Sequence, residues 1–275
     1  MMHRVLAPLP TKYRLRLARF ISDRISHRAP NRPELYPVDG GAMYLNLAES
    51  RMMAMRAIGM HEPEKHALIK RLLKPGMTFL DVGANKGDFS VLAASIVGDE
   101  GRVIAIEPEP HNWEDLARNI ALNGFTNVST HQLALGDFDG RSTLYLGQKS
   151  GWHTLKSGQR QQPVGEVEIE VATMDAMIRS LGVEAPDLVK IDVEGSEVEV
   201  IKGAEATIAR APEIVLLIDL HPQMGANLDA LEEMFLRHNI SSFEMEPPHR
   251  RLDRLPRVAC DVVATRQQEL LEQGR

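Results

Sequence analysis

The sequence contains a single cysteine, and this scarcity excludes several kinds of protein. One thiol cannot form a disulfide framework within the chain or a zinc site built on cysteines. Cys260 lies in the apolar run VACDVVAT, so we expect a buried thiol there rather than a nucleophile. Long hydrophobic runs are absent too, since none approaches the roughly 18 apolar residues of a membrane span. Arginines interrupt the apolar part of the N-terminus, which is unlike a secretory signal peptide, and we therefore expect a cytoplasmic protein.

Positive charge gathers at one end of the chain. Residues 1–32 hold eight lysines and arginines and a single acid, Asp23, although the net charge of the whole chain is −6. The remaining residues are therefore strongly acidic, which argues against a nucleic-acid partner because phosphate contacts dominate that kind of affinity. We expect the basic segment either to contact an anionic membrane surface or an acidic glycolipid, or to form a solvated helix that folds onto the rest of the protein.

The order of the expected elements indicates an α/β protein. Residues 1–45 are expected to be irregular, with one helix near residues 12–26, and two helices follow at 46–60 and 62–74. From residue 77 onwards, short apolar runs alternate with helical patterns. The expected strands cover residues 77–82, 102–108, 127–135, 187–192 and 213–220. The expected helices that alternate with them cover residues 86–97, 110–123, 174–181, 196–210 and 226–238.

Two further pairs of strands complete the pattern. Residues 141–146 and 167–174 are expected to form extra strands around a polar loop, and residues 241–246 and 257–265 an antiparallel pair at the end of the chain. The nearly continuous apolar strands predict a Rossmann-like, mostly parallel sheet with helices on both faces. The predicted division is a basic extension, residues 1–45, and one domain, residues 46–275, made of N-terminal helices at 46–76 and an α/β core at 77–265.

The turn after the first strand of this core, DVGANKG at residues 81–87, indicates the ligand. Gly83 and Gly87 are four residues apart, which fits neither the dinucleotide fingerprint nor a phosphate-binding P-loop. Asp81 at the strand end would repel a pyrophosphate by about 4 kcal/mol at about 4 Å in a half-buried site. The same carboxylate would attract a cation. S-adenosylmethionine is cationic and lacks phosphate, so we expect it to be bound here, with the glycines allowing close backbone approach.

Two more strand ends supply candidate contacts to this cofactor. Glu107 ends the strand RVIAIEP, where a carboxylate can accept both ribose hydroxyls of a nucleoside. NAD sites share that contact, and a surface acid at a strand end is the alternative. Asp137, in LALGD, is expected either to bind the adenine amino group or to form a turn before Gly140.

These motifs together resemble a known family. DVGANKG, IEPEP, LALGD and LVKIDVEGSEVEVIKGA are similar to the FkbM family of S-adenosylmethionine-dependent methyltransferases, over roughly residues 43–222. The resemblance implies a class I methyltransferase fold, a seven-stranded sheet whose last strand is antiparallel. It also implies methyl transfer, usually to an oxygen of a sugar or a secondary metabolite. By position, cofactor contacts would be Asp81, Gly83, Asn85, Gly87 and Glu107. The fourth-strand motif would comprise Lys190, Asp192 and Glu194.

Candidate catalytic residues follow two strands that are neighbours in this fold. Lys190, Asp192 and Glu194 alternate along the fourth strand and its exit, and Asp219 and His221 alternate along the fifth. An acceptor hydroxyl needs a base, so one hypothesis makes a carboxylate or His221 the general base. A second hypothesis has Mg²⁺ lower the pKa of the acceptor hydroxyl, bound by Asp192, Glu194, Asp219 and in some arrangements His221. A third assigns the carboxylates only to capping the helix at 196–210.

The acceptor is expected to be a small molecule or a glycan. Trp152 and His153 in the polar loop are candidates to cover it, and Tyr44 is a candidate to line its pocket together with Asn46 and nearby methionines. Packing in the core or placement on the surface is the alternative for all of these residues. Other functions that the pattern leaves open are a nucleotide-linked oxidoreductase of Rossmann type and a module that binds the cofactor without catalysis.

Overall fold

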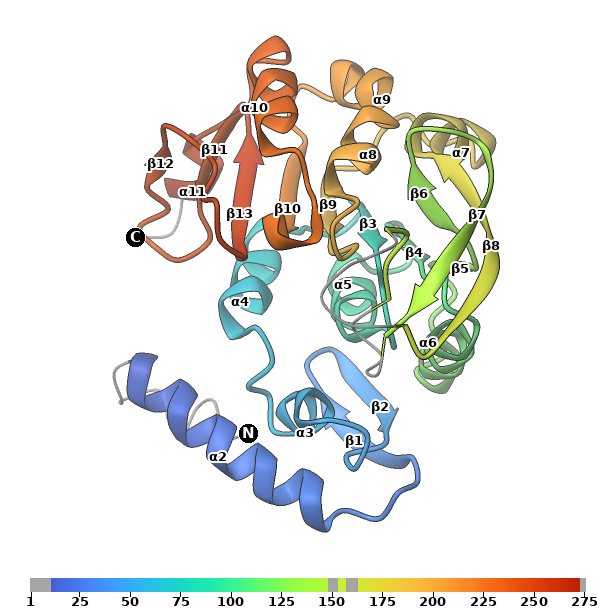
Figure 1. Cartoon of the computed structure of the whole chain (residues 1–275). Coiled ribbons are helices and arrows are strands. Elements are labelled where there is room, and N and C mark those ends of the chain that lie inside the picture. Colours follow the sequence, from blue (N-terminus) through green and yellow to red (C-terminus); the bar gives the residue numbers. More distant parts are fainter. Residues whose placement is uncertain (1–10, 148–152, 157–162, 273–275) are drawn as a thin grey trace.

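A computed structural model of the chain describes residues 11–147, 153–156 and 163–272. Its main element is a sheet with the strand order β12-β11-β13-β10-β9-β3-β4-β5 (Figure 1). These strands are β3 (Thr78–Val82), β4 (Arg102–Ile106), β5 (Val128–His131), β9 (Leu188–Ile191), β10 (Val215–Leu220), β11 (Ser241–Glu244), β12 (Arg251–Leu252) and β13 (Cys260–Thr265). Within this sheet β10, β9, β3, β4 and β5 run parallel to one another. Strand β13 lies between β10 and β11 and is antiparallel to both.

This arrangement is the predicted class I methyltransferase fold. Seven strands have the expected directions, and the antiparallel pair of β11 and β13 that the end of the sequence indicates is present. The two-residue strand β12 is an eighth member beyond the expected seven, paired to the outer edge of β11. All carboxyl ends of the parallel strands lie along one edge, where ligands bind in open α/β sheets.

Helices cover both faces of the sheet because side chains alternate along each strand (Figure 1). On one face, Leu80 and Leu216 belong to a buried apolar cluster formed with four helices. These are α7 (Met174–Ser180), α8 (Glu197–Lys202), α9 (Glu205–Arg210) and α10 (Leu228–Arg237). On the other face, Phe79 and Leu217 pack with helices α4 (Pro63–Leu72) and α5 (Asp88–Val97), and α6 (Pro110–Leu122) lies beside α5. Each fully buried side chain of this size stabilises the fold by about 1.5–3 kcal/mol.

Two expected elements are divided in the structure. The strand expected at 127–135 becomes β5 and the short strand β6 (Ala134–Gly136), which joins β7 (Gly140–Leu146) and β8 (Gly165–Thr173) in a separate sheet. The helix expected at 196–210 is divided into α8 and α9 around Gly203. A Cβ atom on Gly203 would lie 1.9 Å from the carbonyl oxygen of Gly136, so the helices can pack against β6 only without a side chain there.

The N-terminal part differs more from the expectation. Helix α2 (Thr11–Arg28) is present, but residues expected to be irregular form the hairpin β1 (Glu34–Val38) and β2 (Gly41–Leu45). The sequence signal is Asp39-Gly40, a two-residue turn in which Gly40 has φ +84°. The helix expected at 46–60 is the shorter α3 (Arg51–Ala57), which begins where the Ser50 side chain accepts a hydrogen bond from the Met53 amide. The short helix α11 (Glu269–Glu272) closes the described chain.

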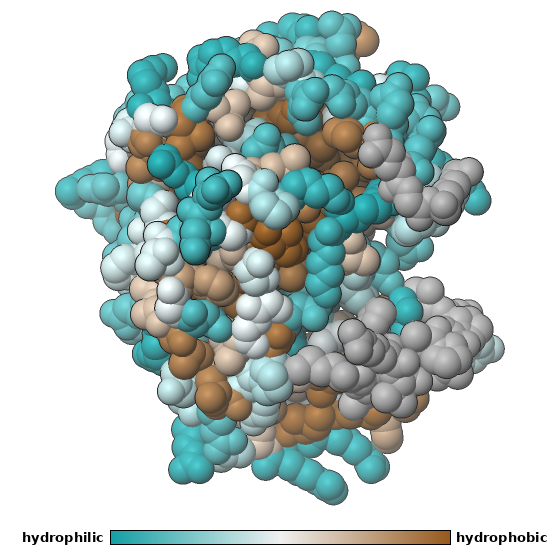
Figure 2. All heavy atoms as spheres, turned by 180° about the vertical axis from the view of Figure 1, so that it is seen from behind, coloured by the Kyte–Doolittle hydropathy of each residue, from teal (hydrophilic) through white to brown (hydrophobic). Residues whose placement is uncertain are grey.

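The surface mixes polar and apolar residues. Seen from behind, hydrophobic residues form separate patches between hydrophilic ones (Figure 2). Within the described ranges, no helix has the length and apolar content needed to cross a membrane.

Candidate active site

A cavity of about 670 Å³ opens at the carboxyl ends of the central parallel strands. Its floor includes Gly83 after β3, Glu107 after β4 and Asp192 after β9. Helices α2 and α3 contribute another part of the wall, through residues that include Arg19, Met52, Met55 and Arg56. A volume of this size, with a few convergent polar groups, is typical of a site for a small molecule or a cofactor.

The turn after β3 is shaped by glycines that no other residue could replace without strain. Gly83 has φ +76°, and a Cβ atom there would lie 1.9 Å from the carbonyl oxygen of Asp192. Gly87 has φ +94° and immediately precedes α5, with a Cβ position 2.8 Å from a methyl group of Leu116. Gly83 and Asn85 line the cavity, while Gly87 sets the start of the helix behind them.

Asp81 differs from the prediction that it faces the ligand. Its side chain is completely buried and does not line the cavity. It accepts a hydrogen bond of 2.6 Å from the Ser90 hydroxyl, and one of its oxygens lies 3.4 Å from Nζ of Lys190. The charge of Asp81 is therefore balanced inside the protein. Its effect on the turn is indirect, because the Lys190 ammonium also donates a 2.7 Å hydrogen bond to the Gly83 carbonyl.

Glu107 does line the cavity, and its carboxylate is held in one orientation. It accepts hydrogen bonds from the backbone amides of Asn85, at 2.8 Å, and Glu109, at 3.1 Å. Burial disfavours the charged form more than these hydrogen bonds favour it, and raises the pKa of Glu107 to about 7. A buried acceptor of this kind gains most from additional donors, such as a pair of hydroxyl groups.

Asp137 is exposed and does not line the cavity, so its predicted contact with adenine gains no support from the structure. It lies in the turn between β6 and β7, which agrees with the alternative, turn-forming role.

The residues predicted to contact the acceptor differ in their positions relative to the cavity. Tyr44 lies on β2 outside the cavity lining, whereas His153 lines it, and Trp152 lies outside the described residues.

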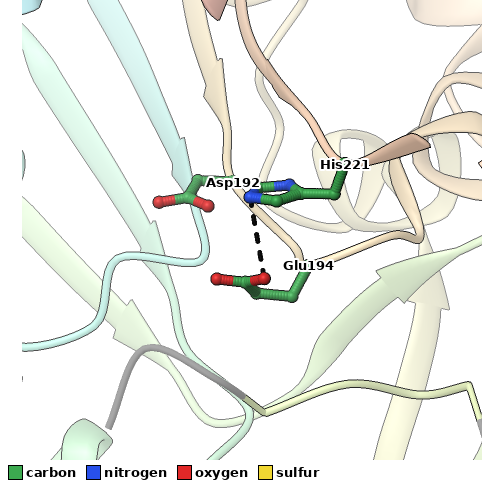
Figure 3. Close-up of side chains that lie close together, drawn as sticks. All are labelled: Asp192, Glu194 and His221. Atoms are coloured by element: carbon green, nitrogen blue, oxygen red, sulfur yellow. Dashed lines mark ion pairs between the residues drawn. The ribbon is translucent and has the colours of Figure 1, made fainter. Parts of the chain in front are cut away.

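Three predicted side chains converge beyond the ends of β9 and β10 (Figure 3). One ligand atom from each of Asp192, Glu194 and His221 lies within 4.8 Å of the others. Glu194 and Gly195 both have positive φ, 49° and 104°, so the chain turns sharply after β9. Gly195 has no room for a side chain, because its Cβ position lies 2.6 Å from Cβ of Met224 on the 3₁₀ turn η1 (Pro222–Met224) that follows His221.

Neighbouring carboxylates set the charge of His221. Its Nδ1 atom lies 2.8 Å from Oε1 of Glu197, and its Nε2 atom lies 3.6 Å from Oε2 of Glu194. Burial alone would lower the pKa of His221, but the hydrogen bond to Glu197 and the charges of Glu194 and Asp192 outweigh it and raise the pKa to about 9. At neutral pH His221 is therefore a cation, which is a poor general base.

For Glu194, burial and neighbouring negative charges outweigh the nearby cations. Burial, together with the negative charges of Asp192 and Glu197, raises the pKa of Glu194 to about 7, although His221 and Lys190 oppose the shift. A carboxylate with this pKa is suited to accept a proton at neutral pH. Lys190, in contrast, remains an ammonium, since Asp81 and Asp192 raise its pKa against the effect of burial. It cannot serve as a base, and its contacts fit a positioning role.

Asp219 is held apart from these groups, contrary to its prediction as a metal ligand beside Asp192 and Glu194. Both of its oxygens accept hydrogen bonds from the ammonium of Lys65, a fully buried residue on α4. Lys65 also donates to Glu62 at 2.7 Å and lies 3.7 Å from Asp261. The three carboxylates are close enough to hold a metal, but the ammonium already occupies the space between them.

The structure adds residues in and around the cavity that sequence reasoning missed. Lys65 has no local sign of its role, because its partner Asp219 is 154 residues away in the chain. Glu197 lies inside the quoted KIDVEGSEVEV motif, but nothing in the motif indicates that its side chain orients a histidine on another strand. Arg56, on α3, donates to Asn85 at 3.1 Å and lines the cavity.

Known proteins resemble the chain over this region. Residues 81–243 match a protein family described as the methyltransferase FkbM domain. "Methyltransferase 1" of Beauveria bassiana is 27% identical over 146 residues, which cover 46% of this chain and 57% of that protein. "Methyltransferase sdnD" of Sordaria araneosa is 28% identical over 155 residues, covering 46% and 60%. The chain thus spans less than two thirds of the length of these curated relatives.

Solved structures resemble it more distantly. The crystal structure of methyltransferase FkbM from Methylobacillus flagellatus superimposes with a TM-score of 0.43 at 18% identity, over 78% of this chain and 52% of that one.

Proposed function

The chain belongs to the methyltransferase FkbM domain family, and from that premise we propose that it transfers a methyl group from S-adenosylmethionine to a hydroxyl group of a small molecule or glycan. The observation that carries the proposal is the convergence of Asp192, Glu194 and His221 in a cavity that the Glu107 carboxylate also lines. This supports a proton acceptor and a nucleoside contact within one cavity.

The residues present fit the methyl donor. Gly83 provides a stretch of cavity wall without a side chain, and the oriented Glu107 carboxylate is a ready acceptor for ribose hydroxyls. When bound, S-adenosylmethionine supplies an electrophilic methyl group on a sulfonium. The surplus of carboxylates along the cavity, among them Glu62, Asp192 and Glu194, favours a cationic ligand over a nucleotide phosphate.

The chemistry of the acceptor is assigned to this chain's own residues. Glu194 would accept the proton of the acceptor hydroxyl, and the oxygen would then take the methyl group that S-adenosylmethionine supplies when bound. His221, fixed by Glu197, holds the Glu194 carboxylate through their ion pair of 3.6 Å. Lys190 fixes the donor turn through the Gly83 carbonyl, so the reacting groups are kept in a defined geometry.

A divalent cation is a second way to activate the acceptor. Asp192, Glu194 and His221 are spaced to hold one, and Glu197 bonds the other nitrogen of His221, as carboxylates do behind metal-bound histidines. Mg²⁺ at these residues would supply a lowered pKa for the acceptor hydroxyl. The cation must then displace the proton of His221, so we favour the mechanism with Glu194 as base.

The decisive experiment combines calorimetry and turnover. We expect the purified chain to bind S-adenosylmethionine but not NAD, and to methylate members of a panel of glycans and hydroxylated metabolites. Glu194→Gln should abolish most turnover and leave donor affinity unchanged. Loss of activity with a chelator, restored by Mg²⁺, would favour the cation. Donor binding without turnover on any acceptor would instead favour a binding module, and absence of donor binding would contradict the proposal.

We also propose a cytoplasmic location and no nucleic-acid partner. The charge distribution supports the second of these, because the chain outside residues 1–32 is strongly acidic and would be repelled by a phosphate backbone.

A further inference from the structure

Helix α2 has a row of apolar side chains on its outer face. Tyr13, Leu17 and Phe20 are 59%, 38% and 56% exposed. Their spacing of four and three residues places them on one face of the helix. Single apolar residues on a surface need no explanation, but a continuous row along a helix marks a surface for interaction.

The opposite face of α2 is already occupied. Ala18 is completely buried in a small apolar cluster with Met60, which follows α3. Ion pairs fix the helix at both ends, Arg14 with Glu64 at 2.9 Å and Asp23 with Arg51 at 3.6 Å. The helix therefore cannot turn its apolar row inward without breaking these contacts.

Arginines surround the apolar row. At 100° per residue, Arg16 and Arg28 fall on either side of it and Arg24 falls within it, and all three are exposed. The guanidinium of Arg24 lies 4.7 Å from the ring centre of Phe20. Asp23, the single acid of the helix, is on a flank and paired with Arg51. The outer face of α2 is thus both apolar and cationic.

We propose that this outer face, residues 13, 16, 17, 20, 24 and 28, docks on the surface of an anionic lipid bilayer. An apolar row between arginines is the pattern of helices that lie in the interface between lipid headgroups and acyl chains. Charge selects the bilayer over the alternatives. A second copy of the chain would bring two cationic faces together, and a nucleic-acid backbone would leave the apolar row unpaired.

Docking has a consequence for the cavity. Residues of the same helix line it, among them Arg19, Ser26 and His27. A bilayer bound to α2 would therefore lie close to one wall of the cavity and restrict the directions from which an acceptor enters. The docking itself does not depend on the proposed function, because vesicle binding requires neither methyl donor nor acceptor.

The test is flotation of the full chain with two kinds of vesicle, phosphatidylcholine alone and an equal mixture of phosphatidylcholine and phosphatidylglycerol. We expect binding to the mixed vesicles only, weakened by high salt. Replacing all three arginines (Arg16→Gln, Arg24→Gln, Arg28→Gln) should weaken binding about a hundredfold, at about fivefold for each charge. The double variant Leu17→Ser, Phe20→Ser should weaken it by about tenfold or more.

Matched controls change other exposed residues. Arg250→Gln, Arg251→Gln, Arg254→Gln removes the same charge, and Leu236→Ser, Val258→Ser removes exposed apolar side chains, both away from α2. These variants should bind mixed vesicles like the parent, and melting temperatures should confirm that every variant is folded. Equal binding to both kinds of vesicle, or undiminished binding by either α2 variant, would overturn the proposal. The proposal would also be overturned if the parent protein bound neither kind of vesicle and formed a dimer that the Leu17→Ser, Phe20→Ser variant converts to a monomer.

Discussion

Nδ1 of His221 lies 2.8 Å from Oε1 of Glu197, whose side chain is completely buried at the start of α8. The same oxygen accepts a hydrogen bond of 2.9 Å from the amide of Gly195 in the turn after β9. One carboxylate therefore joins the ends of two neighbouring strands. It keeps His221 protonated, and the cation in turn lies beside Glu194.

Glu197→Gln should change the pH range of activity. The amide has nearly the same shape but carries no charge, so the pKa of His221 should fall from about 9. We expect the alkaline limit of methyl transfer to move to lower pH while the affinity for S-adenosylmethionine stays within about twofold. Glu199→Gln, which removes a carboxylate from the same helix, is the control. An unchanged pH profile would show that Glu197 has only a structural role.

The parent protein should have a bell-shaped dependence of kcat/KM on pH. Glu194 must be ionised to accept a proton, so the rate should rise as the pH increases through about 7. His221 must be protonated to hold that carboxylate, so the rate should fall as the pH increases through about 9. Initial rates between these limits and beyond them test the assignment. A rate that falls as the pH rises through 7 would contradict Glu194 as the base.

Gly83→Ala should destabilise the protein much more than a glycine change of similar conformation elsewhere. Its Cβ atom would lie 1.9 Å from a backbone oxygen of Asp192, and the positive φ adds strain. We expect a loss of about 2–4 kcal/mol in the free energy of unfolding. Gly76→Ala is the control, since Gly76 has φ +86° but open space around its Cβ position, and should lose about 1 kcal/mol. Urea denaturation measures both values, and equal losses would contradict the steric explanation.

Lys65→Met should cost about 3–5 kcal/mol in the free energy of unfolding, because it leaves buried carboxylates without their counter-ion. The affected groups are Asp219, Glu62 and Asp261. The control is Lys70→Met on the same helix. It removes only an exposed ion pair with Asp39 and should cost at most about 1 kcal/mol. Acidic pH should narrow the difference between the two variants, because protonation removes the unpaired charges. Thermal and urea unfolding at neutral and acidic pH test this.

Glu107→Ala should weaken the binding of S-adenosylmethionine by about tenfold or more, because it removes the oriented acceptor for the ribose. Asp137→Ala is the control, since Asp137 is exposed outside the cavity. Isothermal titration calorimetry compares the two. If both variants bind the donor as tightly as the parent, Glu107 has no role in ribose recognition.

Local patterns in the sequence predicted most of the sheet but less of the N-terminal helices and hairpin. The apolar strands and the helices between them have distinct periodicities, and their order fixes a small number of topologies. The hairpin at residues 34–45 was missed although Asp39-Gly40 signals it, because Pro37 and the short strands argue against a sheet. Pro37 is tolerated because β1 is an edge strand of a two-stranded sheet and pairs with β2 on one side.

The candidate site was also predicted only in part from the sequence. Asp192, Glu194 and His221 could be named in advance, because the carboxyl ends of neighbouring parallel strands meet at one edge. The direction in which a particular acid points could not be predicted. Asp81 is turned inward to Lys190 and Ser90, and Asp219 to Lys65, because a buried carboxylate needs a partner wherever the packing supplies one.

By itself, the sequence determined the family, the order of the strands and the turn that leaves no room for side chains, since these depend on residues close together in the chain. The tertiary structure alone decided the pairing of Asp219 with a lysine on α4, the protonation of His221 by a carboxylate on α8 and the outward orientation of the apolar row on α2. Each of these depends on which segments pack together. Burial and charge act between residues that are close in space, and the order of residues in the chain does not give those distances.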